Sequence, residues 1–331
     1  MAAYPKDLIA RPAGAGDVLS NVLRQVRLSG SLQFCFMPQG AWQTDDKPGF
    51  ADRAAMSAPP IPFHIVVAGE CWLKMEGRHV ALVEGDVVAF PFGTGHQLGV
   101  GMNGETVIPT RLLPPKPWRE VPILRHGAGK EHVRLLCGYL QCDIVNFRPL
   151  RDALPRLLHV RSGNAPGAAW LRATIDQIAA EVDQPRSGGL SMLERLSEIT
   201  FIELLRHEIM AAPEGSTGWL AAPADPALGR CLALIHDDPA RAWTLEGLSR
   251  GCGLSKSTLT ERFDTVLATS PISYLRDWRL YLASVELSGS TKSIARIAEE
   301  AGYGTEAAFS RAFARSFGSP PAAWRKLARQ G

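Results

Sequence analysis

The sequence of 331 residues lacks any apolar run near the roughly eighteen residues that a membrane-spanning helix needs. It also lacks an N-terminal apolar stretch of signal-peptide length, so we expect a cytoplasmic protein with no membrane partner. No nucleophile elbow, Walker loop or Cys-x-x-Cys pair occurs. These absences remove the usual sequence signatures of serine hydrolases, P-loop nucleotidases and zinc ribbons.

Charge is nearly balanced, and the small positive excess lies in the C-terminal third. The whole chain has 36 Lys and Arg against 33 Asp and Glu, a formal net charge of +3. Residues 226–331 contain 14 basic and 10 acidic side chains, which leaves 22 basic and 23 acidic ones for residues 1–225. Because positive side chains neutralise phosphates, this third is the part we expect to bind nucleic acid.

Two stretches of that third, Leu248–Phe263 and Ile297–Phe313, repeat one pattern. Each places an apolar residue five positions before a glycine, Gly253 or Gly302, and then apolar residues four apart. The glycine can adopt the positive φ that ends one short helix, and the spacing gives the next helix a buried face. The repeat therefore predicts two helix-turn-helix units.

Residues 226–331 resemble the DNA-binding domain of AraC-type bacterial transcription regulators, in which a long helix joins two helix-turn-helix units. The matching landmarks are Gly253, Phe263, Pro271, Arg279, Ala283, Gly302, Arg311, Phe313 and residues 318–321. The resemblance implies double-stranded DNA and RNA polymerase as partners, and activation of transcription more often than repression.

The second helix of such a unit enters the major groove with its N-terminal residues against base edges. We expect the first unit to contact bases through Ser257, Thr260 and Glu261 and phosphates through Lys256 and Arg262; the second unit offers Glu306, Ala307, Ala308, Ser310 and Arg311. Arg311 is the strongest candidate, because a guanidinium can donate two hydrogen bonds to guanine. The alternative is an Arg311 paired with Glu306 or another acid.

Glu261 departs from the family pattern, because many AraC-type proteins have a basic residue at this position. A carboxylate cannot attract phosphate. Two interpretations stay open: Glu261 accepts a hydrogen bond from cytosine N4, or it holds Arg262 through a local ion pair.

The N-terminal part predicts an all-β unit of short strands punctuated by Gly and Pro. The expected strands are Phe34–Met37, Ile65–Val67, Cys71–Met75, Val87–Phe90 and Arg134–Cys142. Residues 101–131 are rich in Pro and Gly, so we expect a long irregular excursion there.

Residues Gly85–His96 resemble the second motif of cupin domains, which implies a cupin-like β-barrel sensor at residues 16–150. In metal-binding cupins this His is a ligand together with an upstream His-x-His pair and a Glu. Here only His64 stands upstream, so His64 and His96 are incomplete metal candidates, with His79 or Cys71 as further donors for zinc. The favoured interpretation is an effector pocket, with expected lining residues His64, Trp72, Phe90, Phe92 and His96.

Two cysteines suggest a different signal. The segments around Cys35 and Cys137 resemble those of reactive-chlorine-responsive AraC-type regulators, which implies a pair of redox thiols. Against this, free cysteine is commonly buried and structural, and Cys142 would lie on the opposite strand face from Cys137. A small organic ligand and thiol oxidation therefore both remain as effectors.

Residues 167–183 and 189–211 have helical spacing and predict a helical hairpin, with residues 166–212 as a dimerisation region. A second apolar stripe of this region includes Leu190, Ile199, Ile202 and Leu205, and it predicts either a homodimer contact or packing within the monomer. A stretch rich in Pro, Gly, Ser and Ala at residues 211–226 predicts a linker to the DNA-binding domain at 226–331.

The predicted fold class is α+β: a cupin-like β-barrel, a helical hairpin and an all-α double helix-turn-helix domain. The predicted function is a sequence-specific transcription regulator, not an enzyme, whose effector is sensed in the cupin domain. The alternative is a cupin-type metal-dependent enzyme with an appended DNA-binding module, which would need a ligand set such as two His and a carboxylate.

Overall fold

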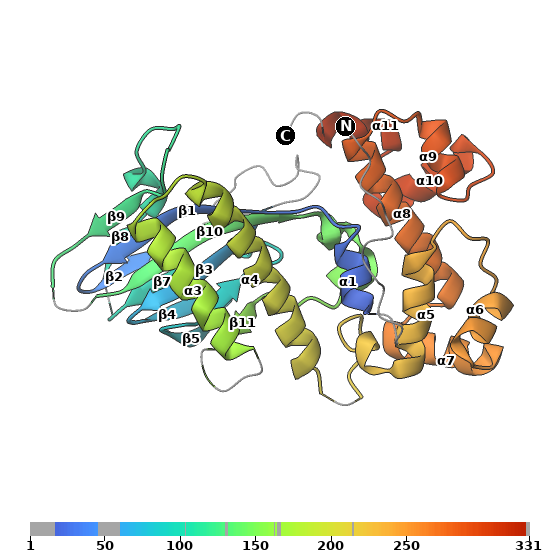
Figure 1. The fold of residues 1–331 in the computed structure, drawn as a ribbon, viewed down its shortest axis with the longest axis horizontal. Helices are drawn as coiled ribbons and strands as arrows, with labels where there is room; N and C mark the ends of the chain where they lie inside the picture. Colours follow the sequence, from blue (N-terminus) through green and yellow to red (C-terminus); the bar gives the residue numbers. More distant parts are fainter. Residues whose placement is uncertain are drawn as a thin grey trace. The chain divides into compact units, whose positions relative to one another are not determined.

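The computed structural model describes residues 17–45, 60–102, 104–129, 132–161, 163, 167–213 and 215–328 (Figure 1). These residues divide into two compact units. A helical unit comprises residues 17–25 and 213–318, and a β unit comprises residues 26–212 together with residues 319–328. The units therefore do not follow one another simply along the chain.

Two sheets form the centre of the β unit. The six-stranded sheet has the order β11-β6-β3-β10-β1-β9, and the five-stranded sheet has the order β5-β4-β7-β2-β8. The strands are β1 Leu28–Pro38, β2 Trp42–Thr44, β3 Ile61–Ala68, β4 Glu70–Met75, β5 Arg78–Val83, β6 Val87–Ala89, β7 Gln97–Val100, β8 Glu105–Val107, β9 Ile123–His126, β10 Arg134–Cys142 and β11 Leu158–Val160. This arrangement confirms the cupin-like β domain predicted from the sequence.

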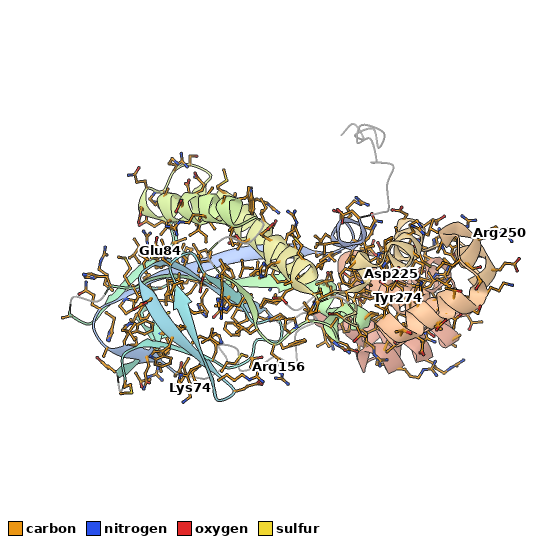
Figure 2. All side chains as sticks on the ribbon, turned by 90° about the horizontal axis from the view of Figure 1, so that it is seen from below. Lys74, Glu84, Arg156, Asp225, Arg250 and Tyr274 are labelled. Carbon is orange, nitrogen blue, oxygen red and sulfur yellow. The ribbon has the colours of Figure 1, made fainter. Side chains whose placement is uncertain are left out.

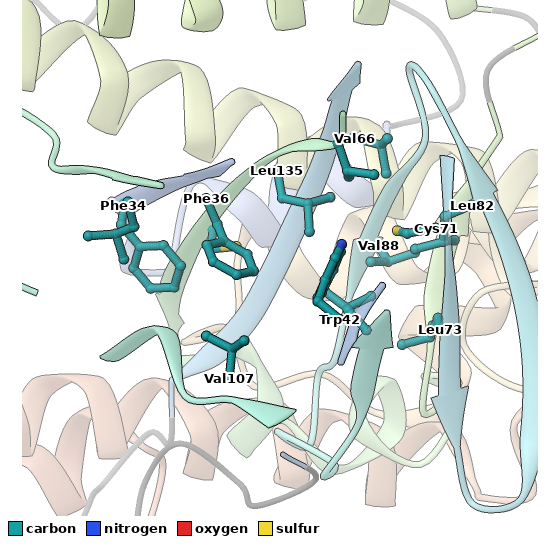
Figure 3. Close-up of a cluster of buried hydrophobic side chains, with 14 of the residues drawn as sticks. Phe34, Phe36, Trp42, Val66, Cys71, Leu73, Leu82, Val88, Val107 and Leu135 are labelled. Carbon is teal, nitrogen blue, oxygen red and sulfur yellow. The ribbon is translucent and has the colours of Figure 1, made fainter. Parts of the chain in front are cut away.

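Apolar side chains from both sheets form one buried cluster (Figure 3). Phe36 of β1 meets Trp42 of β2 edge to face, with ring centroids 5.3 Å apart, and both side chains are buried. Alternation along β4 turns Cys71 and Leu73 into this cluster. Burial of such side chains removes apolar area from water, each contributing about 1.5–3 kcal/mol.

Predicted strands are confirmed where they are long. Four of the five expected segments lie wholly within strands, and Arg134–Cys142 coincides with β10. The fifth, Val87–Phe90, extends one residue beyond β6, which ends at Ala89. The prediction of an irregular excursion at residues 101–131 is wrong in part, because β8, the 3-10 helix η2 (Pro109–Leu112) and β9 lie within it. Strands of three or four residues are too short to show a period of two, so neighbouring Pro and Gly dominated the pattern.

Helices α3 (Ala168–Asp183) and α4 (Gly189–Ala211) form the predicted hairpin and cover the outer face of the six-stranded sheet (Figure 1). Arg134 of β10 donates two hydrogen bonds to the Asp183 carboxylate of α3, at 2.9 and 2.7 Å. Part of the predicted second stripe packs inside the monomer, because Leu205 is buried, whereas Leu190 and Ile199 are exposed.

Short helices joined by tight turns build the helical unit. They are α5 Pro226–Asp237, α6 Leu245–Cys252, α7 Lys256–Leu267, α8 Pro271–Gly289, α9 Ile294–Glu300 and α10 Glu306–Phe317; the next helix in the chain is α11 Pro321–Ala328. Gly253 and Gly302 have φ values of +71° and +79°, as the repeat predicted, and they separate α6 from α7 and α9 from α10. Two helix-turn-helix units are thereby confirmed.

The stretch at residues 211–226, predicted as a linker, contains a fully buried aromatic anchor. Trp219 Nε1 donates a hydrogen bond of 2.8 Å to Tyr274 Oη, and the same hydroxyl lies 2.9 Å from His236 Nε2. All three side chains are buried. The end of the linker is therefore part of the helical unit's core.

Helix α1 (Val18–Leu23) packs against α5 of the helical unit. Val18 and Val22 are buried, and Arg24 lies 3.9 Å from the Asp237 carboxylate. These residues fall inside the range 16–150 predicted for the sensor, yet they group with the C-terminal helices.

Within the described ranges, none of the helices combines the length and the apolar character needed to cross a membrane.

Candidate nucleic-acid interface and ligand cavity

Helix α7 is the second helix of the first helix-turn-helix unit. Ser255 caps its N-terminus by accepting from Thr258 N, and Leu259 and Phe263 bury its inner face. The predicted base-contacting residues Ser257, Thr260 and Glu261 are all exposed. The predicted phosphate contact Lys256 is also exposed, but its Nζ lies 3.1 Å from Glu246 Oε2 of α6.

Arg262 differs from the prediction, because its guanidinium is engaged within the protein. Its Nη1 donates to Oδ2 of Asp225, the residue that caps α5 (Figure 2 labels Asp225). Oδ1 of the same carboxylate accepts from Ala227 N at 2.9 Å and Leu228 N at 3.0 Å. Arg262 therefore ties α7 to α5, and Asp225, not Glu261, is its partner.

Several interactions determine the charge of Asp225. Burial acts to raise the pKa of its carboxyl, but the backbone hydrogen bonds from Leu228 and Ala227 and the Arg262 guanidinium lower the pKa below its usual value. The carboxylate is therefore ionised at neutral pH. A phosphate that recruited Arg262 would have to compete with this pair.

Helix α10 is the second helix of the second unit, and its first two side chains are exposed. Thr305 caps it by accepting from Ala308 N, and Phe309 and Phe313 are buried. Glu306, Ala307 and Arg311 are exposed, and Ala308 and Ser310 are half-buried. Among the described residues, the Arg311 guanidinium has neither an ion-pair nor a hydrogen-bond partner, so the predicted alternative of an Arg311–Glu306 pair does not occur.

A cavity of about 120 Å³ opens on the inner face of the six-stranded sheet. Its walls are mostly apolar and aromatic, and its polar groups include the Asp45 carboxylate and hydroxyl and imidazole groups. The lining residues are Phe34, Phe36, Thr44, Asp45, Pro62, His64, His96, Leu98, Ile108, Pro109, Thr110, Leu135, Cys137, Gly138 and Tyr139. The structure thus brings His64 and His96 together on one cavity.

Three side chains in the wall form a chain of short contacts. Cys137 Sγ lies 3.0 Å from His64 Nδ1, His64 Nε2 lies 2.8 Å from His96 Nε2, and His96 Nδ1 lies 2.9 Å from the Thr94 carbonyl oxygen. Strand pairing explains the first contact, because His64 of β3 stands directly opposite Cys137 of β10. The His96 ring stacks on Phe90, with centroids 3.6 Å apart.

Burial keeps the first two groups of this chain uncharged. It raises the pKa of the Cys137 thiol well above its ordinary value. Burial, followed by repulsion from His96, lowers the pKa of His64 well below its ordinary value. The resting state at neutral pH is therefore a thiol beside a neutral imidazole.

The other residues predicted to line the pocket lie elsewhere. Trp72, Phe90 and Phe92 are not among the described residues of the cavity wall. Trp72 points away from the core, since Cys71 and Leu73 on either side of it point inward, and its Nε1 donates to the Gly101 carbonyl oxygen at 2.9 Å. Phe90 is fully buried behind His96.

Cys35 and Cys137 lie on neighbouring strands but face opposite sides of the sheet. Phe34 pairs directly with Cys137, and both side chains line the cavity. Cys35, the next residue along β1, therefore points to the outer face, where its Sγ accepts from Arg134 Nε at 3.4 Å. A disulfide between Cys35 and Cys137 would require the strands to rearrange.

The donor atoms do not fit a cupin metal site. His64 and His96 direct their Nε2 atoms at each other, and Cys137 contacts the opposite nitrogen of His64, so the three donors do not converge on one point. Across the described ranges, no group of three His, Cys, Asp or Glu side chains is placed to hold a metal ion.

Sequence reasoning missed three residues of these sites. Asp225 had a visible signal, because Asp before Pro226 is a typical N-cap. Tyr139 alternates with Cys137 along β10 and could have been placed on the same face. Thr94 contributes a backbone carbonyl, and a side-chain pattern cannot reveal that role.

Comparison with known proteins identifies the family. The sequence matches the Cupin family over residues 17–210 and the Helix-turn-helix domain family over residues 248–327. A putative AraC-like transcription regulator of Streptomyces antibioticus is 30% identical over 319 residues, covering 94% of this chain and 98% of the relative. This chain belongs to the AraC-type transcription regulators.

Two further proteins are similar to this chain, one over most of its length and one over a third of it. The RCS-specific HTH-type transcriptional activator RclR of Escherichia coli is 26% identical over 272 residues, covering 82% of this chain and 86% of RclR. The crystal structure of a transcriptional regulator with an AraC-type DNA-binding domain, from Chromobacterium violaceum, is 25% identical to this chain, with a TM-score of 0.32. The matched region is 33% of this chain and 97% of the solved one. The AraC-type regulator described here is a DNA-binding protein with an N-terminal cupin domain.

Proposed function

We propose that this regulator reads a bipartite DNA site with α7 and α10 and responds to a small organic effector in the cupin cavity. The observation that carries this proposal is the N-terminal half of α10, in which the Arg311 side chain is exposed and has no partner among the described residues. Recognition helices of one protein suit half-sites one helical turn apart, roughly 34 Å. Arg311 would read guanine, and Ser310 and Glu306 would flank it.

In the first unit we assign base contacts to Ser257, Thr260 and Glu261. A carboxylate suits the amino group of cytosine, and with Arg262 held by Asp225 this interpretation of Glu261 is favoured. Lys256 would contact phosphate after leaving Glu246, an exchange that costs little because both side chains are exposed.

A small ligand is favoured over disulfide formation as the effector. The cavity has apolar walls and a few polar groups, which is the usual composition of ligand sites. The positions of Cys35 and Cys137 on opposite faces disfavour a direct disulfide. Thiol oxidation stays as the second candidate, supported by the similarity to RclR.

Dimerisation through the α3–α4 hairpin completes the proposal. Large apolar side chains stay exposed on these helices: Trp170, Leu190, Met192, Ile199 and Met210. A homodimer would cover these side chains and raise the effective concentration of DNA-binding domains at paired DNA sites. Activation through RNA polymerase, in the cytoplasm, follows from the family pattern.

The test is recovery and sequencing of host genomic fragments bound by the full-length protein, reduced and after mild hypochlorite. Enrichment of a bipartite motif with half-sites one helical turn apart is expected in the reduced state. A motif whose occupancy changes only after hypochlorite would favour the thiol signal, and absence of a bipartite motif in both states would overturn the proposed reading. Sedimentation of Ile199→Asp, with exposed Glu194→Ala as the control, tests dimerisation separately.

A further inference from the structure

The contacts around Cys137 have a defined direction of hydrogen bonding. A carbonyl oxygen can only accept, so we assign the proton of a neutral His96 to Nδ1, facing Thr94. His96 Nε2 is then an acceptor, and His64 Nε2 donates to it. His64 Nδ1 is left as the acceptor for the Cys137 thiol. One arrangement of protons therefore gives each of the three contacts, Cys137–His64, His64–His96 and His96–Thr94, a donor and an acceptor.

This arrangement has the parts of an activated nucleophile: a thiol, a base within hydrogen-bond distance and a third group that orients the base. When the proton moves from Cys137 Sγ to His64 Nδ1, the proton on His64 Nε2 can move to His96 Nε2. The positive charge then lies on His96, whose remaining N–H is bonded to the Thr94 carbonyl. Burial keeps the thiol protonated until a reaction partner arrives.

The cavity restricts what can reach the sulfur. Phe34, Phe36 and Leu135 surround Cys137 with apolar surface, and the cavity measures only about 120 Å³. The described wall contains the Asp45 carboxylate and no Lys or Arg side chain. Small, uncharged molecules are therefore favoured over anions at this sulfur.

We propose that Cys137 is a covalent capture site for small, uncharged electrophiles with a carbon–carbon double bond conjugated to a carbonyl group. This proposal rests on the proposed role of the cavity as the effector site. The sulfur bonds to the β-carbon as the π bond breaks and its electron pair moves onto the carbonyl oxygen. The thiol proton passes to His64 and His96 and is finally delivered to the α-carbon, so nothing is lost and no oxidant is needed.

The test uses the reduced full-length protein and methyl vinyl ketone at pH 7, with adducts located by tandem mass spectrometry. Cys137 should gain the mass of one reagent molecule at least about tenfold faster than Cys71 and Cys142, since general-base assistance typically contributes about 10²–10⁴-fold. Equal rates at the three sites would overturn the proposal. Acrylate, with rates normalised to glutathione, should label Cys137 much more slowly, and equal normalised rates would contradict the preference for uncharged reagents.

A second experiment asks whether His64 acts as the base. His64→Gln should slow adduct formation at Cys137 by about tenfold or more. His79→Gln is the matched control, because His79 is exposed on β5, and it should label at the wild-type rate. His96→Gln provides a second variant if His64→Gln fails to fold, as judged by circular dichroism. If both folded variants were labelled at the wild-type rate, His64 and His96 would have no role in activating Cys137.

Failure here and failure of the proposed function can be told apart. Genomic-fragment binding by the unmodified protein does not depend on the adduct. If the bipartite motif is enriched but Cys137 is not labelled, the capture site is wrong and the reading by α7 and α10 stands. If Cys137 is labelled but the motif is absent, the capture site stands and the proposed DNA recognition by α7 and α10 is wrong.

Discussion

The two helix-turn-helix units share a backbone pattern but use their charges differently. In the first unit, Arg262 is bound to Asp225 and Lys256 to Glu246, so both predicted phosphate contacts have protein partners. In the second unit, the Arg311 guanidinium is exposed and has no described partner. The contrast lies in the second helices, because both cations predicted to contact phosphate on α7 are bound within the protein, whereas on α10 the Arg311 guanidinium is left available. A repeat in sequence can therefore conserve the backbone of a helix-turn-helix unit without conserving the use of its cations.

The helix ends differ in the same sense. The C-cap residue that follows α10 is Gly318 with φ +73°, a conformation that glycine adopts without steric cost. The C-cap residue that follows α7 is Ala268 with φ +49°, a left-handed conformation that is unfavourable for alanine. The first unit therefore contains both an extra tie to α5 and a strained end, and the second contains neither.

Removing Arg311 should have the largest effect on recognition. Arg311→Ala should cost about 1–3 kcal/mol of discrimination at one base pair, because a two-bond contact with guanine is lost. Arg315→Ala, one turn later and also exposed, should weaken binding evenly across sequences. Fluorescence anisotropy with the enriched motif and single-base variants measures both, and unchanged discrimination by Arg311→Ala would contradict the assignment.

Acid should destabilise the helical unit through His236. Burial lowers its pKa to about 3, whereas the unfolded chain has a pKa near 6.5. The unfolded state therefore binds the proton first, and the unfolding free energy should fall as the pH drops from about 6.5 toward 3, by up to about 1.4 kcal/mol per pH unit. Urea unfolding between pH 6.5 and 5 should show a flatter dependence for His236→Gln, and identical slopes would remove His236 as the cause.

The tie between α5 and α7 should support stability more than base preference. Asp225→Ala removes both the N-cap and the partner of Arg262, so the unfolding free energy should fall by about 1–2 kcal/mol. Asp225→Asn keeps a capping oxygen and should lose about half of that. If either variant instead changed which bases are selected, Arg262 would have a direct role at the DNA.

The strained end of α7 should give the smallest change. Ala268→Gly should raise the unfolding free energy by about 1 kcal/mol, because glycine relieves the left-handed strain. Gly318→Ala should lower it by a similar amount at the matching end of α10. Thermal unfolding measures both, and shifts of the same sign would show that the two ends are not equivalent.

The architecture could be predicted from the sequence more fully than the side-chain partners could. Gly253 and Gly302 could be predicted as corners because a positive φ limits the choice of residue. Strand β10 could be predicted because its nine residues form a mostly apolar run. The Asp225–Arg262 pair joins residues 37 positions apart, and no local pattern encodes such a contact. The opposite facing of Cys35 and Cys137 became visible only when the pairing of β1 with β10 was known.

Helix α1 bears on how the regulator can be divided experimentally. A fragment that starts at the linker would lack Val18 and Val22, and the surface of α5 that they cover would be exposed to water. A sensor fragment starting at residue 17 would carry the same apolar helix without its site. The two units are therefore defined by their contacts and not by their order in the sequence. A sensor fragment should begin after residue 25, and a DNA-binding fragment should have the α1 sequence added to it.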